Sequence, residues 1–154
     1  MKKVAILIGS RSDEEVMRGC TEYLTRFGIP HDLRVLSAHR NPDETAAFVK
    51  QAETSGYALI IAAAGMAAHL PGFVAALTIL PVIGVPLAGS ELHGVDALYS
   101  VVQMPAGIPV ATLAIGSAGA KNAAVLAAEI LALQEPSLVT RLREFRAQGA
   151  KFSS

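Results

Sequence analysis

The 154-residue sequence has little of what secreted, membrane or nucleic-acid-binding proteins rely on. Its single cysteine, Cys20, excludes an internal disulfide and favours a reducing, cytoplasmic location. The 13 lysine and arginine residues are balanced by 13 aspartate and glutamate residues, so the chain has no net positive charge to attract nucleic acid. Aromatic residues make up only 5%, few for base stacking. We therefore expect neither nucleic acid nor a membrane as a partner, and we expect Cys20 to pack on a helix.

Charge is almost missing from one long stretch of the chain. Between residues 55 and 120 the only acidic or basic side chains are Glu91 and Asp96. A membrane-spanning helix needs about 20 consecutive apolar residues. Glycines and prolines interrupt this stretch and leave runs of strand or short-helix length: Gly65, Pro71, Gly72, Pro81, Gly84, Pro86 and Gly89. The stretch therefore predicts buried strands and short helices rather than a membrane span.

Apolar residues make up 52% of a chain of single-domain length, so we expect one catalytic domain over residues 1–154. Runs of β-branched and aliphatic residues predict strands at 4–8, 31–36, 57–62, 82–85 and near 110–113. Amphipathic or alanine-rich segments between them predict helices. These include a short helix over 67–77 and, after it, helices over 95–102, over 121–133 and from Pro136 onward. This alternation predicts a three-layer α/β/α fold with a doubly wound, flavodoxin-like parallel sheet.

Polar residues gather directly after the first three predicted strands. GSRSD occupies 9–13, SAHR occupies 37–40, and AGMAAH occupies 64–69. Ligands bind such sheets at the carboxyl ends of the strands, so we expect these segments to form one cleft. The cleft would offer backbone amides, hydroxyls and Arg40 to a phosphate, and His39 and His69 for proton transfer.

Each of these residues also has a structural interpretation. Ser12 and Glu15 have the spacing of a helix capping box, and Asp13 can serve the dipole of the same helix. His39 and Arg40 could lie in a solvated loop, and His69 could be a core histidine. We expect His31 and His93 to be structural or exposed. The glycines match neither dinucleotide-binding nor Walker motifs, and no spacing resembles a metal site.

Four motifs, taken together, carry a family resemblance. They are GSRSD at 9–13, SAHRNP at 37–42, AAHLPG at 67–72 and SVVQMPAGIPV at 100–110. In this order and over nearly the whole chain, they resemble the N5-carboxyaminoimidazole ribonucleotide mutase family, the catalytic-subunit type of phosphoribosylaminoimidazole carboxylase. The resemblance implies a step of de novo purine biosynthesis in which a carboxylate moves from the exocyclic nitrogen to C4 of the imidazole ring, without metal or cofactor.

The resemblance also implies roles for single residues. His39 would be the general acid and base at C4, and His69 would lie near the migrating carboxylate. The ribonucleotide would be bound by the residues at the three strand ends: Ser10, Ser12, Asp13, Ser37, Ala38, Arg40, Gly65 and Leu70.

The chain departs from the family pattern at two positions in the third motif. The family usually reads GAGGAAHLPG where this chain has Ala63 and Met66 in place of two glycines. If either position has a positive φ, the side chain costs roughly 1 kcal/mol or more. Two alternatives to the mutase reaction remain open here: direct carboxylation of aminoimidazole ribonucleotide by CO2, and a nucleotide-binding regulator without enzymatic activity.

The resemblance implies a homo-octamer with sites at subunit contacts. The apolar excess over 67–77 and 95–110 is more than a 16.0 kDa domain can bury, which also favours subunit contacts. We expect the last helix, at about 136–150, to pack on a neighbouring subunit.

Overall fold

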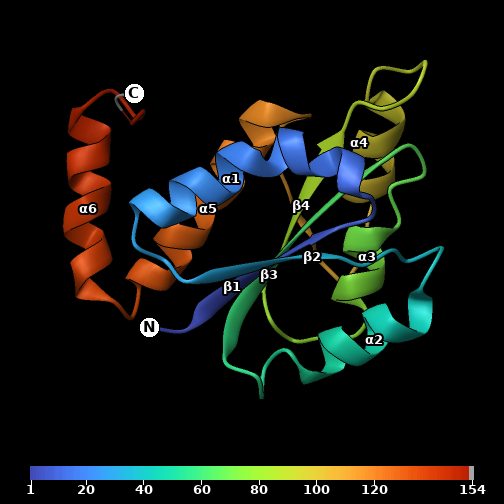
Figure 1. Ribbon diagram of the computed structural model, residues 1–154, viewed down its shortest axis with the longest axis horizontal. Coiled ribbons are helices and arrows are strands. Elements are labelled where there is room, and N and C mark those ends of the chain that lie inside the picture. Colours follow the sequence, from blue (N-terminus) through green and yellow to red (C-terminus); the bar gives the residue numbers. More distant parts are fainter. Residues whose placement is uncertain (153–154) are drawn as a thin grey trace.

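The computed structural model describes residues 1–152 and contains a five-stranded, wholly parallel sheet between two layers of helices (Figure 1). The strands are β1 (Lys3–Ile8), β2 (His31–Val35), β3 (Tyr57–Gly65), β4 (Val82–Leu87) and β5 (Ala111–Thr112). Their order across the sheet is β2-β1-β3-β4-β5, with every neighbouring pair parallel. This is the flavodoxin-like order, so the predicted fold class is confirmed.

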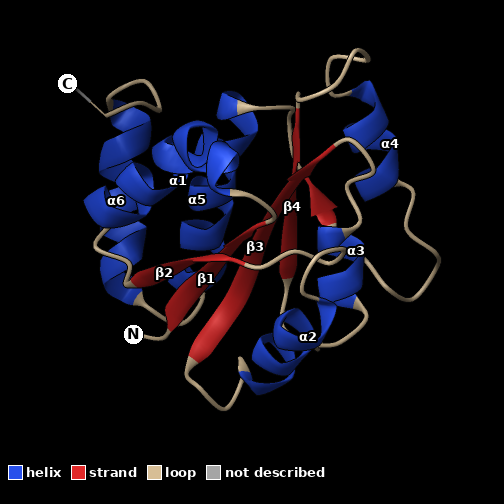
Figure 2. Ribbon diagram, turned by 45° about the vertical axis from the view of Figure 1, so that its right-hand side comes forward, coloured by secondary structure: helices blue, strands red, loops and turns tan. Residues whose placement is uncertain are grey.

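The helices divide between the two faces of the sheet (Figure 2). One face carries α1 (Glu14–Arg26), α5 (Ser117–Ala132) and α6 (Pro136–Ala147), and the other carries α2 (Pro42–Gln51), α3 (Leu70–Ala75) and α4 (Val95–Val102). The described residues contain one 3-10 turn, η1 (Arg11–Asp13), which directly precedes α1. The prediction for 95–102 is confirmed, whereas the helix expected over 67–77 is shorter and begins only after His69.

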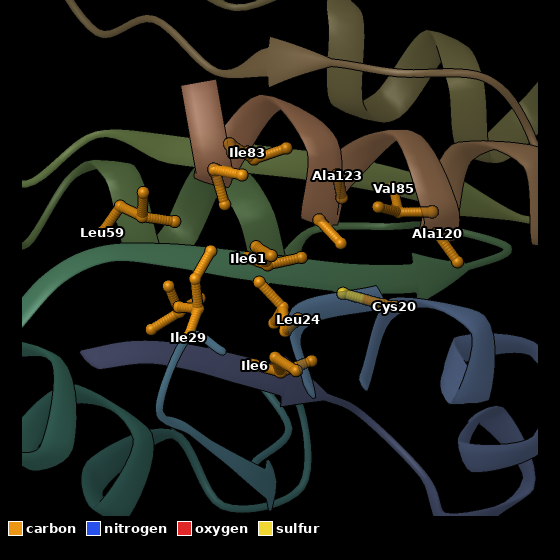
Figure 3. Packing of buried hydrophobic residues seen from close by; sticks show 14 of the residues in the cluster. Ile6, Cys20, Leu24, Ile29, Leu59, Ile61, Ile83, Val85, Ala120 and Ala123 are labelled. Atoms are coloured by element: carbon orange, nitrogen blue, oxygen red, sulfur yellow. The ribbon is translucent and has the colours of Figure 1, made fainter. Parts of the chain in front are cut away.

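The larger core lies between the sheet and the layer of α1 and α5 (Figure 3). Side chains of β1 and β3 are fully buried there, and Leu24 and Cys20 of α1 pack onto them. Met17 is fully buried at the start of the same stripe, whereas Val16 is only partly buried. The packing role expected for Cys20 is confirmed, since the residue is fully buried in the core cluster, and this burial raises the pKa of its thiol to about 12.

Part of the charge-poor stretch is explained by its position in the sheet. β3 and β4 are central strands, and nearly all of their side chains are buried. Parallel strands covered on both faces have continuous apolar sequences for this reason. Within residues 1–152, no helix is both long and apolar enough to cross a bilayer.

The last helix packs on its own chain. Leu138 and Phe145 of α6 are buried in the core cluster formed with α1 and α5, and the Arg141 guanidinium donates to the carbonyl of Phe27. The expected contact of α6 with a neighbouring subunit would therefore involve its exposed side, and it stays a prediction.

A polar cluster at the end of the sheet where the strands begin joins β1, β2 and β3. The hydroxyl of Tyr57 donates to the Asp32 carboxylate at 2.6 Å, and Lys3 Nζ donates to the same carboxylate at 2.9 Å. The bond from Tyr57, followed by that from Lys3, lowers the pKa of Asp32. An ionised Asp32 therefore stabilises the fold above the ordinary pKa of a carboxyl, and this contribution is lost as the pH falls through the lowered value.

We expect Asp32→Asn to lower the free energy of unfolding by about 0.5–1 kcal/mol at pH 7, since the side chain is 41% exposed and the pair is screened. The difference from the wild type should shrink as the pH falls from about 4 through the lowered pKa of Asp32, below which the carboxyl is protonated and both side chains are neutral. Denaturant unfolding at pH 7 and at acidic pH measures both quantities. Glu53→Gln, on an exposed carboxylate after α2, is the control. Equal stability of Asp32→Asn and wild type at pH 7 would contradict this account.

Candidate active site

The register of the sheet brings the four longer strands to one edge. Val35, Ile8, Ala63 and Val85 lie opposite one another in a single row across β2, β1, β3 and β4. The loops that follow these strands surround a cavity of about 320 Å³. Its lining includes all ten predicted site residues and five others: Gly9, Ser10, Ser12, Asp13, Ser37, Ala38, His39, Arg40, Ala64, Gly65, Met66, Ala67, His69, Leu70 and Gly89. The structure therefore brings together every residue predicted for the site.

The turn after β1 forms the first wall of this cavity. Ser10 caps η1, its Oγ accepting from the amide and from the hydroxyl of Ser12 at 3.4 and 3.0 Å. The predicted capping box of Ser12 and Glu15 is wrong, because the 3-10 turn precedes α1 and moves Ser12 out of the capping position. Partial burial raises the pKa of the Asp13 carboxyl in this wall. A carboxylate beside two hydroxyls suits hydrogen bonding to a hydroxylated ligand.

The loop after β2 is held by its own hydrogen bonds. Ser37 Oγ accepts from the amides of His39 and Arg40 at 3.2 and 3.1 Å. Asn41 Oδ1 accepts from the Ser37 amide at 2.7 Å. Thr45 Oγ1, fully buried at the start of α2, lies 3.1 Å from the Ser37 carbonyl oxygen and 2.9 Å from that of Asn41. The backbone that carries His39 and Arg40 is thus fixed from within the chain.

Sequence reasoning missed Asn41 and Thr45 as supports of this loop. Asn41 stands before Pro42, where an N-cap is the ordinary expectation, yet its side chain makes no cap bond and serves Ser37 instead. A buried threonine hydroxyl has no periodic sequence signal. Only the folded loop identifies both residues as supports of the site.

The two cavity histidines contact each other. His39 Nε2 lies 2.6 Å from His69 Nδ1, and the rings meet edge to face at 86° with their centroids 4.7 Å apart. A nitrogen–nitrogen contact of this length needs one N–H and one lone pair, so the two rings share one proton at this point. Both residues are exposed, which excludes the core interpretation of His69. The pair can pass a proton to or from a ligand in the cavity.

The loop after β3 forms the third wall and has a strained residue. Met66 has φ of +54°, a conformation that costs about 1–2 kcal/mol for a residue with a side chain. Ala63 lies within β3 and has no positive φ, so only one of the two departures from the family pattern is strained. Gly65 lies close to β4, and a Cβ there would be 3.2 Å from the Leu87 carbonyl oxygen. This glycine, the last residue of β3, allows the end of the strand to lie close to Leu87 of β4.

The remaining predictions about single residues can be placed in the same way. Gly89, in the loop after β4, lines the cavity and was missed, although the rule that strand ends form sites also applies to the fourth strand. His31 and His93 lie outside the cavity lining, as expected. Over residues 1–152, no three histidine, cysteine, aspartate or glutamate side chains gather in a way that could hold a metal ion.

Comparison with known proteins identifies relatives over most of the chain. The family described as AIR carboxylase matches residues 3–151. The chain is 57% identical over 143 residues to the N5-carboxyaminoimidazole ribonucleotide mutase of Brucella melitensis, covering 93% of this chain and 88% of that protein. It is 54% identical over 144 residues to the mutase of the same name from Escherichia coli, covering 94% and 85%. A crystal structure of PurE from Treponema denticola superimposes with a TM-score of 0.86 at 31% identity, covering 96% and 90%.

The buried hydroxyl of Thr45 yields a test of the loop after β2. Thr45→Val keeps the shape of the side chain but removes the donor to two carbonyl oxygens, so we expect a loss of about 1–2 kcal/mol in the free energy of unfolding. Denaturant unfolding measures this loss. Thr54→Val is the matched control, because its exposed hydroxyl bonds only the Gln51 carbonyl oxygen. Equal effects of the two substitutions would show that Thr45 does not anchor the loop.

Proposed function

Since the chain belongs to the AIR carboxylase family, we propose that it acts in de novo purine biosynthesis as an N5-carboxyaminoimidazole ribonucleotide mutase. The reaction moves a carboxylate from the exocyclic nitrogen N5 to C4 of the imidazole ring. The observation that carries this function is the contact of His39 with His69 inside a cavity lined by all the residues expected to bind the ribonucleotide. The reducing cytoplasm is the proposed location, which suits a buried Cys20 thiol.

The first two walls of the cavity suit the ribose-phosphate part of the substrate. Arg40 provides a guanidinium for charge-assisted hydrogen bonds to the phosphate, and the hydroxyls of Ser10 and Ser12 add neutral ones. The carboxylate of Asp13 would accept hydrogen bonds from the ribose hydroxyls. It would not lie beside the phosphate, because the two negative charges repel each other. Ser37, whose Oγ already fixes the loop, sets the position of Arg40.

The histidine pair supplies the proton that the reaction moves. When the bond between N5 and the carboxylate carbon breaks, its electron pair stays on N5, which takes a proton from His39. C4 then attacks the released CO2, and the proton on C4 returns to His39. His39 thus gives one proton to N5 and regains one from C4, so a single acid–base group suffices. The contact with His69 orients the imidazole ring of His39.

The third wall suits the carboxylate in transit. Ala64, Gly65, Ala67 and Leu70 present no charge and no hydroxyl to the cavity. Small apolar groups exclude water while CO2 is unattached, so the molecule stays near C4. A direct carboxylase would instead take CO2 from solution. The relatives from Escherichia coli, Brucella melitensis and Saccharolobus solfataricus, each more than 50% identical over most of this chain, carry the mutase name, which favours transfer within one ribonucleotide.

We expect the purified protein to interconvert the two carboxylated ribonucleotides in the absence of bicarbonate, as followed by absorbance. His39→Asn should lower kcat by about a thousandfold, since it removes the acid–base group, and should change the affinity for the product ribonucleotide little. Calorimetric titration of the variant with product measures that affinity.

His31→Asn is the matched control for this substitution. His31 lies at the start of β2, at the opposite end of the sheet from the cavity, so its replacement should leave turnover near the wild-type value. Strict dependence on CO2 and free aminoimidazole ribonucleotide would identify a direct carboxylase. Nucleotide binding without either reaction would identify a regulator, and wild-type turnover by His39→Asn would refute the role of His39.

Several chains would assemble through α4, and we propose a homo-octamer. Val95, Tyr99 and Val102 recur at the spacing of one helical face and are 44%, 65% and 45% exposed, and Leu92 extends this apolar surface. An apolar stripe of this kind marks a protein contact on a chain of this size. The exposed side of α6 would contribute to the same assembly.

Sedimentation analysis should therefore give a particle of about eight times the 16.0 kDa chain mass. Tyr99→Lys adds a charge in the middle of the stripe and should shift the protein toward smaller species, because the charge would be buried at the contact. Gln51→Lys, an exposed change at the end of α2, is the control and should leave the mass unchanged. A monomeric wild type would refute the assembly and leave the apolar stripe on α4 unexplained.

A further inference from the structure

Met66 stands out among the residues that line the cavity. Most of its neighbours there are small, namely Gly9, Ser10, Ser12, Ser37, Ala38, Ala64, Gly65, Ala67 and Gly89. Met66 instead brings a long apolar side chain to the same wall, and 59% of its surface is exposed. The methionine is therefore held at the cavity by its backbone and not by packing in the core.

That backbone is in a conformation that disfavours any side chain. Met66 has φ of +54° in the segment between the end of β3 and the start of α3. Strained backbone of this kind is concentrated at functional sites, where the surroundings impose it. A glycine would remove the strain and an exposed side chain adds little to stability, so stability does not account for methionine here.

Met66 lies near the histidine pair along the chain. His69, whose Nδ1 lies 2.6 Å from His39 Nε2, follows Met66 by three residues. The uncharged segment made of Ala64, Gly65 and Ala67 surrounds it. Its thioether is unbranched, polarizable and freely rotating, so it can move aside for a ligand and then lie against it.

We propose that Met66 is a movable apolar cover that holds CO2 in the cavity between its release from N5 and its capture by C4. The inference rests on the proposed mutase function and names a further residue that decides the outcome of that reaction. Met66 exchanges neither protons nor electrons with the substrate. It keeps water out and CO2 in while the N5–carbon bond is broken and the C4–carbon bond has not yet formed.

The cover determines how often a turnover ends in lost CO2. The test uses N5-carboxyaminoimidazole ribonucleotide labelled in its carboxylate, and it compares label found in the C4-carboxylated product with label released as CO2, after subtraction of spontaneous release. Met66→Ala removes most of the side chain at the same positive φ, Met66→Gly removes the strain as well, and Met66→Leu keeps an unbranched start and apolar bulk.

We expect both Met66→Ala and Met66→Gly to raise the released fraction per turnover by about fivefold, and Met66→Leu to stay within about twofold of the wild type. Product affinity should be unchanged in all three. Met66→Gly should melt at or above the wild-type temperature when compared at one protein concentration.

Unchanged partition in Met66→Ala would overturn the cover. An increase in released CO2 with Met66→Gly but not with Met66→Ala would assign the increase to the backbone and would also overturn the cover. A loss of product affinity in parallel with the increase would overturn it as well. A wild type that converts no substrate would refute the proposed function itself, a result distinct from any change among the three variants.

Discussion

Backbone hydrogen bonding between parallel strands aligns Val35, Ile8, Ala63 and Val85 in one row, and the site depends on this alignment. Each of the four strands leaves the sheet within a few residues of that row. Their loops therefore start side by side, whatever side chains they carry. A shift of one register step in β3 would move Gly65, Met66 and His69 by about 3.3 Å relative to the loop of His39, which exceeds the length of the contact between the two histidines.

The loops themselves achieve precision by different means. The one after β2 is tied to its own helix by Ser37, Asn41 and Thr45, so His39 rests on a framework that requires no ligand. The one after β3 accepts an unfavourable φ at Met66 next to a glycine that must pass close to β4. A rigid support thus carries His39, the proposed acid–base group, while the neighbouring wall has an exposed, weakly packed side chain. The proposed transfer of a small fragment within one ligand would benefit from both properties, because His39 would keep its position while the proposed cover moves.

Much of this organisation could be predicted from the sequence. Continuous apolar runs such as Val4–Ile8 indicate buried parallel strands, and the rule that ligands bind at strand ends then pointed to the three segments that hold nine of the ten site residues. Leu70 and the role of each binding residue came from the family resemblance. What escaped prediction depends on three-dimensional neighbours. The cap passed from Ser12 to Ser10 because a 3-10 turn intervenes. The bonds of Thr45, the contact of His39 with His69 and the sign of φ at Met66 arise only when separate segments meet.

The two edges of the sheet limit how copies of this chain can associate. β2 presents Asp32 and Arg34 along one edge, and β5, at the other edge, is only two residues long and follows Pro109, which has no amide hydrogen to donate. Charged or very short edge strands oppose the addition of another strand. Growth by strand addition, the route to open-ended fibres, is thus disfavoured at both edges. The proposed assembly would therefore use helix surfaces such as α4, where symmetry can close an assembly at a finite size.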